Sequence, residues 1–308
     1  MEDHIQENLQ RLKKENIKFL HMQFTDIQGI VKTLTLPENR FEDALTEGVV
    51  FDGSSVAGYA QIEESDMRAV PDLSTFTVSP YSTGGNAARY ICNIFNSDGT
   101  RFEGDPRYVL EKNLKQLWED GKDLNVGPEF EFFLFRKDEH GNVVNEPGDH
   151  AGYFDHTPND TSAKIRQEIL LNLGALGYEP EAAHHEVAFG QHEIDLRYTT
   201  ALLMADRITV LKSVIKNAAE NHGFFASLHA QAHQWSEWLG DAHTPEHNDK
   251  GQKNEHIRWK LSSKDVQVSF QFPFSHIAAE FIPFPLFDSQ EVVIHMIPEY
   301  FLHDLALG

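Results

Sequence analysis

The sequence predicts two domains of mixed α and β structure, a small one at the N-terminus and a larger one after it. Short apolar strands separated by turn residues occupy roughly the first hundred residues. Beyond them, strands alternate with helical patterns. At 308 residues the chain is long enough to bury two cores. Strands are expected near 124–135, 178–187 and 191–198, and helices near 161–174 and 200–221.

The N-terminal elements follow from spacing and turn residues. Residues 3–16 place apolar side chains at helical spacing, with charges between them. Asp105 and Pro106 suit the N-cap and first position of a later helix, which Gly121 would end. The first domain is therefore expected to end near residue 100. Its strands are expected at 19–24, 31–36, 49–52, 75–80 and 88–95.

Composition narrows the class of protein. The formal net charge is −22 and basic residues do not cluster, so no nucleic-acid partner is expected. No apolar run reaches membrane-spanning length, and the N-terminus lacks a signal peptide's apolar core. The single cysteine, Cys92, leaves no internal disulfide and reads as a buried small hydrophobe. A cytoplasmic protein with no membrane partner is expected.

Two segments, 127–135 and 184–195, suggest a metal site. The first reads as a strand, which places Glu129 and Glu131 on one face and the neighbouring phenylalanines on the other. The second adds Glu186 and Glu193. A pair of acidic residues on a strand is most often a solvated face, and a lone His-His-Glu is a weaker signal still. Together they offer four carboxylates and no thiolate cluster, which favours Mg²⁺ or Mn²⁺ over zinc.

These segments resemble the metal-binding strands of bacterial and archaeal type I glutamine synthetases. So do Phe51-Asp-Gly-Ser-Ser, Ile62-Glu-Glu-Ser-Asp-Met and Phe102-Glu-Gly-Asp-Pro-Arg, in the family's order and spacing. The resemblance covers residues 1 to about 226. It implies an α+β fold, with a β-grasp-like domain over 1–103. Residues 104–226 would form the first part of a catalytic domain built on a curved antiparallel sheet, leaving that domain incomplete.

The resemblance also implies an activity, the ATP-dependent ligation of ammonia to L-glutamate through a γ-glutamyl phosphate. The family uses two divalent cations per site, Mg²⁺ or Mn²⁺. By motif position, Glu131, Glu186 and Glu193 resemble ligands of the cation nearer glutamate and ammonium. Glu129 resembles a ligand of the cation on the ATP phosphates.

Other roles are implied in the same way. Glu181 occupies a position associated with nucleotide binding. Asp52 resembles the aspartate that binds ammonium and helps to deprotonate it, with Ser55 beside it, and Tyr59 stands where an aromatic residue lines the same entrance. In the family this loop reaches a neighbouring subunit of a homo-oligomer, a dodecamer of two hexameric rings.

Residues 227–308 do not match the family and form an aberrant tail. Read one base later, plausible codons for 228–247 encode a segment similar to the family's Asn-Gly-Ser-Gly-Met-His loop. Because tryptophan has a single codon, Trp235 and Trp238 each force a glycine in the shifted reading. Trp238 gives the first glycine of this loop, and Trp235 gives a glycine that the family has three positions before it. The hypothesis is a frameshift, which predicts little regular structure beyond about residue 230 and an inactive chain.

The tail's other features do not suggest a second site. Its histidines show no regular ligand spacing, and the apolar segment Phe270–Phe287 fits neither a helix nor an amphipathic strand. Two alternatives to glutamine synthesis stay open. One is a related ligase that joins glutamate's γ-carboxyl to another amine, and the other is a non-catalytic family member kept as an oligomer component.

Overall fold

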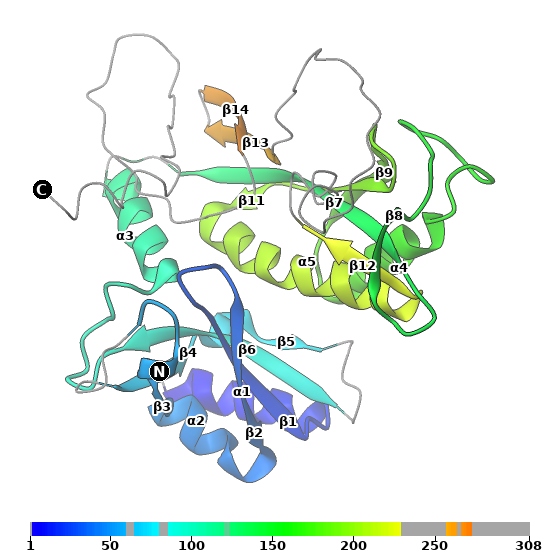
Figure 1. The fold of residues 1–308 in the computed structure, drawn as a ribbon. Helices are drawn as coiled ribbons and strands as arrows, with labels where there is room; N and C mark the ends of the chain where they lie inside the picture. Colours follow the sequence, from blue (N-terminus) through cyan, green and yellow to red (C-terminus); the bar gives the residue numbers. More distant parts are fainter. Residues whose placement is uncertain are drawn as a thin grey trace, which may run out of the picture. The chain divides into compact units, whose positions relative to one another are not determined.

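The structure is a computed structural model that describes residues 2–59, 65–79, 86–119, 121, 123–228, 257–263 and 266–272, the last two ranges as backbone only. Its described residues divide into two compact units, one up to Asp123 and one from Leu124 onward (Figure 1). The predicted boundary between residues 103 and 104 stays a prediction.

The first unit is built on a mixed sheet of order β2-β1-β6-β4-β3, with β5 paired to β6. Strands β1 and β6 run parallel and the other neighbours are antiparallel. The strands are β1 (Phe19–Thr25), β2 (Val31–Pro37), β3 (Val49–Asp52), β4 (Asp66–Pro71), β5 (Thr77–Val78) and β6 (Ala87–Phe95). The helices are α1 (Glu2–Lys14), α2 (Phe41–Glu47) and α3 (Pro106–Glu119), with short 3-10 turns η1 (Glu38–Arg40), η2 (Gly53–Ser55) and η4 (Leu73–Thr75).

The core of this unit follows from alternation along the strands. Leu20 and Met22 on β1 and Tyr90 on β6 are fully buried, and Leu12 of α1 packs into the same cluster. Cys92 is also buried, as predicted. These residues confirm the small mixed-sheet domain that the sequence predicts.

Helix α3 begins where the sequence predicts. Asp105 caps it, since one of its carboxylate oxygens accepts the backbone N–H of Arg107 at 3.0 Å. The other oxygen accepts from the backbone N–H of Ile94 at 3.1 Å, which fixes the helix start to β6. The Arg107 side chain donates to Asp72 and Asn93.

The second unit has an antiparallel sheet of order β14-β13-β7-β10-β9, to which β8, β11 and β12 are added by pairing with β7. Strand β7 (Asn125–Lys137) is the long central member. The others are β8 (Val143–Pro147), β9 (Pro180–His185), β10 (Gln191–Leu196), β11 (Thr199–Thr200), β12 (Phe224–Ser227), β13 (Ile257–Ser263) and β14 (Val266–Phe272).

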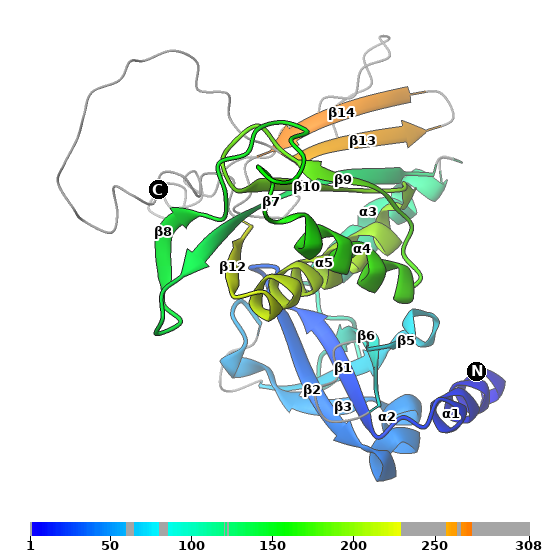
Figure 2. The same ribbon diagram turned by 90° about the vertical axis from the view of Figure 1, so that its right-hand side faces the viewer.

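Helices α4 (Ala163–Ala175) and α5 (Ala201–Asn221) lie on one face of this sheet (Figure 2). Phe130 and Phe132 of β7 and Ile194 of β10 are fully buried, as expected for side chains on the helix-covered face. The intervening residues of β7 and β10 therefore point to the opposite face. This architecture confirms the predicted catalytic-type domain with an antiparallel sheet and helices.

The tail is described only at β13 and β14, which form a hairpin, with β13 paired to β7 from Asn125 to Glu129. The expectation of little regular structure beyond residue 230 does not hold for these fourteen residues. Backbone pairing with β7 needs only N–H and C=O groups, so a strand can form there whatever its side chains. The frameshift tryptophans, the histidine-rich stretch and most of Phe270–Phe287 lie outside the described residues.

Among the described helices, none is both long and apolar enough to span a membrane.

Candidate metal centre

The face of the sheet opposite the helices carries a row of acidic side chains. In the β7–β10 register, Glu131 lies opposite Glu193 and Glu129 lies opposite Asp195. On the other side of β10, His184 of β9 lies opposite Glu193. Directly opposed residues of antiparallel strands share a face, so three strands contribute to one polar surface.

Three of the four predicted metal ligands converge on this surface. Glu131, Glu186 and Glu193 each offer a carboxylate oxygen, and these oxygens lie within 4.8 Å of one another. Glu186 follows β9 directly, and its backbone N–H donates to the carbonyl of Gln191 at 2.8 Å. The Gln191 side chain donates to Glu131 at 2.9 Å. The β9–β10 turn therefore both presents Glu186 and orients Glu131.

The turn depends on Gly190. Its φ is +66°, in the left-handed region, and a Cβ there would lie 2.8 Å from the Leu134 carbonyl oxygen. The Gly190 carbonyl in turn accepts the N–H of Leu134 at 2.8 Å. The close approach of the turn to β7 therefore requires glycine, and it holds Glu186 near the strand that carries Glu131.

A second set of ligand atoms overlaps the first. His184, Glu193 and Asp195 also offer ligand atoms within 4.8 Å of one another, so Glu193 belongs to both sets. One oxygen of Asp195 is buried and has no hydrogen-bond partner among the described residues. Glu129 lies opposite Asp195 in register but belongs to neither set. His184 and Asp195 were not predicted as ligands, although both lie in the segment 184–195 that suggested the site.

Glu193 shows that the carboxyl groups of this surface repel one another. Its side chain is only 10% exposed. Burial, and then the nearby carboxylates of Asp195, Glu131 and Glu186, raise the pKa of Glu193 to about 9. A bound divalent cation would relieve both causes, and three carboxylate oxygens are a donor set that suits a hard cation. The residues present therefore fit such an ion.

An aromatic pair lies beside the acidic surface. Tyr153 and Phe154 stack with ring centroids 4.0 Å apart, and both rings meet His184 edge-on. Partial desolvation, then the charges of Glu186, Glu193 and other carboxylates of the row, raise the pKa of Tyr153. Tyr153 was not among the predicted site residues. The available signal was a Gly-Tyr-Phe-Asp loop between two predicted elements.

The remaining predicted residues belong to neither set of ligand atoms. Asp52 belongs to the first unit, where its carboxylate accepts from the backbone N–H and hydroxyl of Ser54, and these bonds lower its pKa. Ser55 ends η2 and is exposed. The Tyr59 hydroxyl donates to the backbone carbonyl of Thr25 at 2.5 Å.

Glu181 also stands outside both ligand sets. It is exposed on β9, next to the point where the β9–β10 register shifts between Asp195 and Leu196. Its role in binding a nucleotide stays a prediction.

Comparison with known proteins places these features in one family. The model of the glutamine synthetase beta-Grasp domain matches residues 16–97, and that of the glutamine synthetase catalytic domain matches 103–240, past the predicted end of similarity near 226. Glutamine synthetase of Thermus thermophilus is 49% identical over 227 residues, covering 72% of this chain and 51% of the relative. That of Halobacterium salinarum is 45% identical over 222 residues, covering 71% and 49%.

Solved structures agree at the level of the fold. A cryo-EM structure of Plasmodium falciparum glutamine synthetase has a TM-score of 0.69 at 23% identity, covering 91% of this chain and 56% of that one. An apo GmaS structure has a TM-score of 0.69 at 24% identity, covering 83% and 56%. The chain spans about half the length of the curated relatives it matches. On the two domain matches and the curated relatives, the chain belongs to the glutamine synthetase family.

Proposed function

We propose that this chain carries the metal-binding part of a glutamate–ammonia ligase that uses ATP. The observation on which the proposal rests is the convergence of Glu131, Glu186 and Glu193 on the face of the antiparallel sheet opposite the helices. In the proposed reaction the side-chain carboxylate of L-glutamate takes the terminal phosphoryl group of ATP. Ammonia then displaces phosphate from the γ-glutamyl phosphate to give glutamine.

The proposed roles follow from charge and position. Glu131, Glu186 and Glu193 would hold one divalent cation, Mg²⁺ or Mn²⁺, and Glu129 would contribute to a second. Bound cations would neutralise phosphate charge as it develops during transfer. Gln191 keeps Glu131 in place through its hydrogen bond, and so contributes orientation rather than charge.

The nucleotide and ammonium roles are part of the same proposal. Glu181 would contact ATP, and Asp52 with Ser55 would bind ammonium. In a homo-oligomer, proposed as a dodecamer of two hexameric rings, that loop would serve a neighbouring subunit. The proposed location is cytoplasmic.

We also propose that the chain as it stands does not synthesise glutamine, because residues 227–308 read as a frameshifted segment. The support is the absence from that segment of the family's Asn-Gly-Ser-Gly-Met-His sequence, together with the finding that plausible codons for 228–247 encode it when they are read one base later. Phosphoryl transfer needs a fully ligated second cation and cationic groups on the phosphate, and each such group is commonly worth about 3 kcal/mol.

The experiment compares the purified chain with a version whose reading frame is corrected after Ala226. Mn²⁺ binding is measured by electron paramagnetic resonance, and glutamine formation from glutamate, ATP and ammonium is measured in parallel. We expect Mn²⁺ to bind both, with E131Q weakening it, and only the corrected chain to make glutamine. Absence of Mn²⁺ binding would contradict the metal centre, and equal turnover would contradict the proposed inactivity.

The same assay separates the alternatives. Turnover of the corrected chain with methylamine but not with ammonium would favour a ligase for another amine. Oligomer formation without turnover on either amine would favour a non-catalytic family member.

A further inference from the structure

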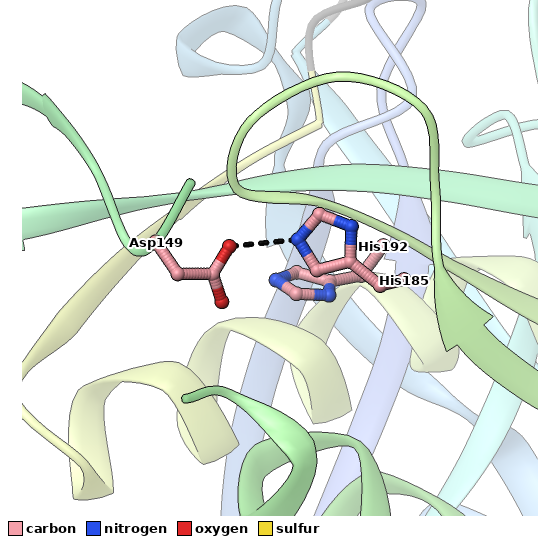
Figure 3. A group of neighbouring side chains, drawn as sticks. All are labelled: Asp149, His185 and His192. Atoms are coloured by element: carbon pink, nitrogen blue, oxygen red, sulfur yellow. Dashed lines mark hydrogen bonds and ion pairs between the residues drawn. The ribbon is translucent and has the colours of Figure 1, made fainter. Parts of the chain in front are cut away.

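A buried polar network lies behind the acidic surface, on the helix-covered face of the sheet. Asp149, His185 and His192 are all buried, and their side chains converge (Figure 3). The alternation of the strands connects this network to the cation ligands. His185 directly precedes Glu186, and His192 directly precedes Glu193, so each buried histidine is the backbone neighbour of a carboxylate ligand.

His185 is bonded at both ring nitrogens. Its Nδ1–H donates to the backbone carbonyl of Glu186 at 2.6 Å, and a carbonyl can only accept. Its Nε2 contacts a carboxylate oxygen of Asp149 at 2.7 Å. The second oxygen of Asp149 accepts from the hydroxyl of Ser162 at 3.2 Å. A continuous chain of bonds thus runs from the start of α4 through Asp149 and His185 to the backbone of Glu186.

His192 is held by a different partner. The Arg166 guanidinium donates to its Nδ1 at 2.8 Å and also forms an ion pair with Asp160. Three potential metal ligands meet here, but a cation is disfavoured. The positive charge of Arg166 is directly bonded to one histidine, and both nitrogens of the other are already occupied. The network is better suited to holding the strands than to binding an ion.

We propose that Asp149 and His185 are positioning residues for the cation ligand Glu186. This inference rests on the proposed function, since it requires the acidic surface to bind a cation. Asp149 fixes the ring of His185, and the ring holds the Glu186 carbonyl at the point where β9 enters the turn. The Glu186 side chain is then presented toward Glu131 and Glu193 before a cation arrives, so the cation need not order it.

The first test is D149N in the full chain, with D72N as the matched control. Asp72 likewise accepts from a buried side chain, in its case that of Arg107 at 2.7 Å, but it belongs to the first unit. We expect D149N to raise the Kd for Mn²⁺ by about 10- to 100-fold, the range found when partners of metal ligands are removed. D72N is expected to lower thermal stability while leaving the Kd within about twofold of the wild type.

The second test uses two replacements of His185 that each keep one of its bonds. The amide nitrogen of asparagine can reach the position of Nδ1, so H185N keeps the bond to Glu186 and loses Asp149. The amide of glutamine can reach the position of Nε2, so H185Q keeps Asp149 and loses the Glu186 carbonyl. We expect H185Q to weaken Mn²⁺ binding more than H185N. The double variant D149N/H185Q should bind Mn²⁺ as tightly as H185Q alone, because Asp149 acts on Glu186 only through His185.

The outcomes separate this inference from the proposed function. If the wild type does not bind Mn²⁺, the proposed metal centre is overturned, and the positioning role with it. If the wild type binds and a folded D149N binds equally well, the positioning role alone is overturned. If circular dichroism shows that D149N does not fold, the Mn²⁺ affinities of H185N and H185Q test the positioning role instead. Equal affinities of these two variants overturn the proposal.

Discussion

Replacing Glu193 by glutamine (E193Q) should change how the stability of the metal-free protein depends on pH. Glu193 shares its surface with Glu131 and Glu186, at oxygen separations within 4.8 Å. At an effective dielectric constant of about 20, two unit charges at that distance repel each other by about 3.5 kcal/mol. Burial of Glu193, and then repulsion from Asp195, Glu131 and Glu186, raise its pKa to about 9.

The sign follows from proton binding. Between the unfolded value near 4.5 and the folded value of about 9, the folded protein holds a proton on Glu193 that the unfolded chain has released. The contribution of protonated Glu193 to the free energy of unfolding is therefore fully present below the unfolded pKa. It is lost as pH rises from the unfolded pKa to the folded pKa. One such group loses at most about 1.4 kcal/mol per pH unit. Between about pH 5.5 and about pH 8.5 the upper limit of the lost stability is therefore about 4 kcal/mol. Because the neighbouring carboxylates are partly exposed, solvent screens their charges, and we expect a loss of about 2 kcal/mol.

The assay is urea unfolding followed by circular dichroism, with EDTA present, for the wild type and E193Q. We expect E193Q to become the more stable of the two by about 2 kcal/mol as pH rises across this range, because glutamine has no proton to release. Saturating Mn²⁺ should reverse the order, since the wild type gains binding energy that E193Q has lost. Parallel pH profiles for the two proteins in EDTA would refute the electrostatic account.

Three further predictions concern the turn, the first unit and the ligands. G190A should lower the free energy of unfolding, measured in urea, by about 3 kcal/mol and should also weaken Mn²⁺ binding. G177A has a similar positive φ but open space around it, so it should lower the free energy of unfolding by only about 1 kcal/mol. Equal losses for the two variants would contradict the close approach of Gly190 to β7. Y59F should lose about 1 kcal/mol through one hydrogen bond, with Mn²⁺ affinity unchanged in a resonance titration; a weakened affinity would count against it. E131Q should raise the Kd of the more tightly bound Mn²⁺ ion by about tenfold or more. E129Q should raise that Kd by less, because Glu129 lies outside both ligand sets. The reverse order would show that Glu129 is a ligand of the more tightly bound ion.

The sequence predicts one strand of the candidate site well, and the pairing between strands poorly. The alternation of Glu129 and Glu131 with phenylalanines indicates which side chains share a face, because strand periodicity is a local property. It does not indicate that Asp195 and His184 join Glu193, because that depends on the register of β7, β9 and β10.

The residues that support the site were harder to predict for the same reason. Asp149 lies 36 positions before His185, and nothing in the sequence pattern couples them. Tyr153 comes from a loop without periodicity, so only the folded chain brings it beside His184. Local sequence patterns therefore predict the fold and the carboxylate ligands. Which side chains surround those carboxylates depends on contacts between distant segments, which local patterns do not predict.

The central position of β7 has a consequence for synthesis of the chain. Within the described residues, this strand pairs with five others, the last of which is β13 near residue 260. As the chain leaves the ribosome, β8 follows β7 closely, but β10, β11, β12 and β13 emerge much later, and until they arrive the aromatic run Phe130–Phe135 lacks most of its partners. A segment of that composition associates readily with copies of itself. Any change that delays or removes its partner strands should therefore appear first as aggregation during expression, before any loss of cation binding is measured.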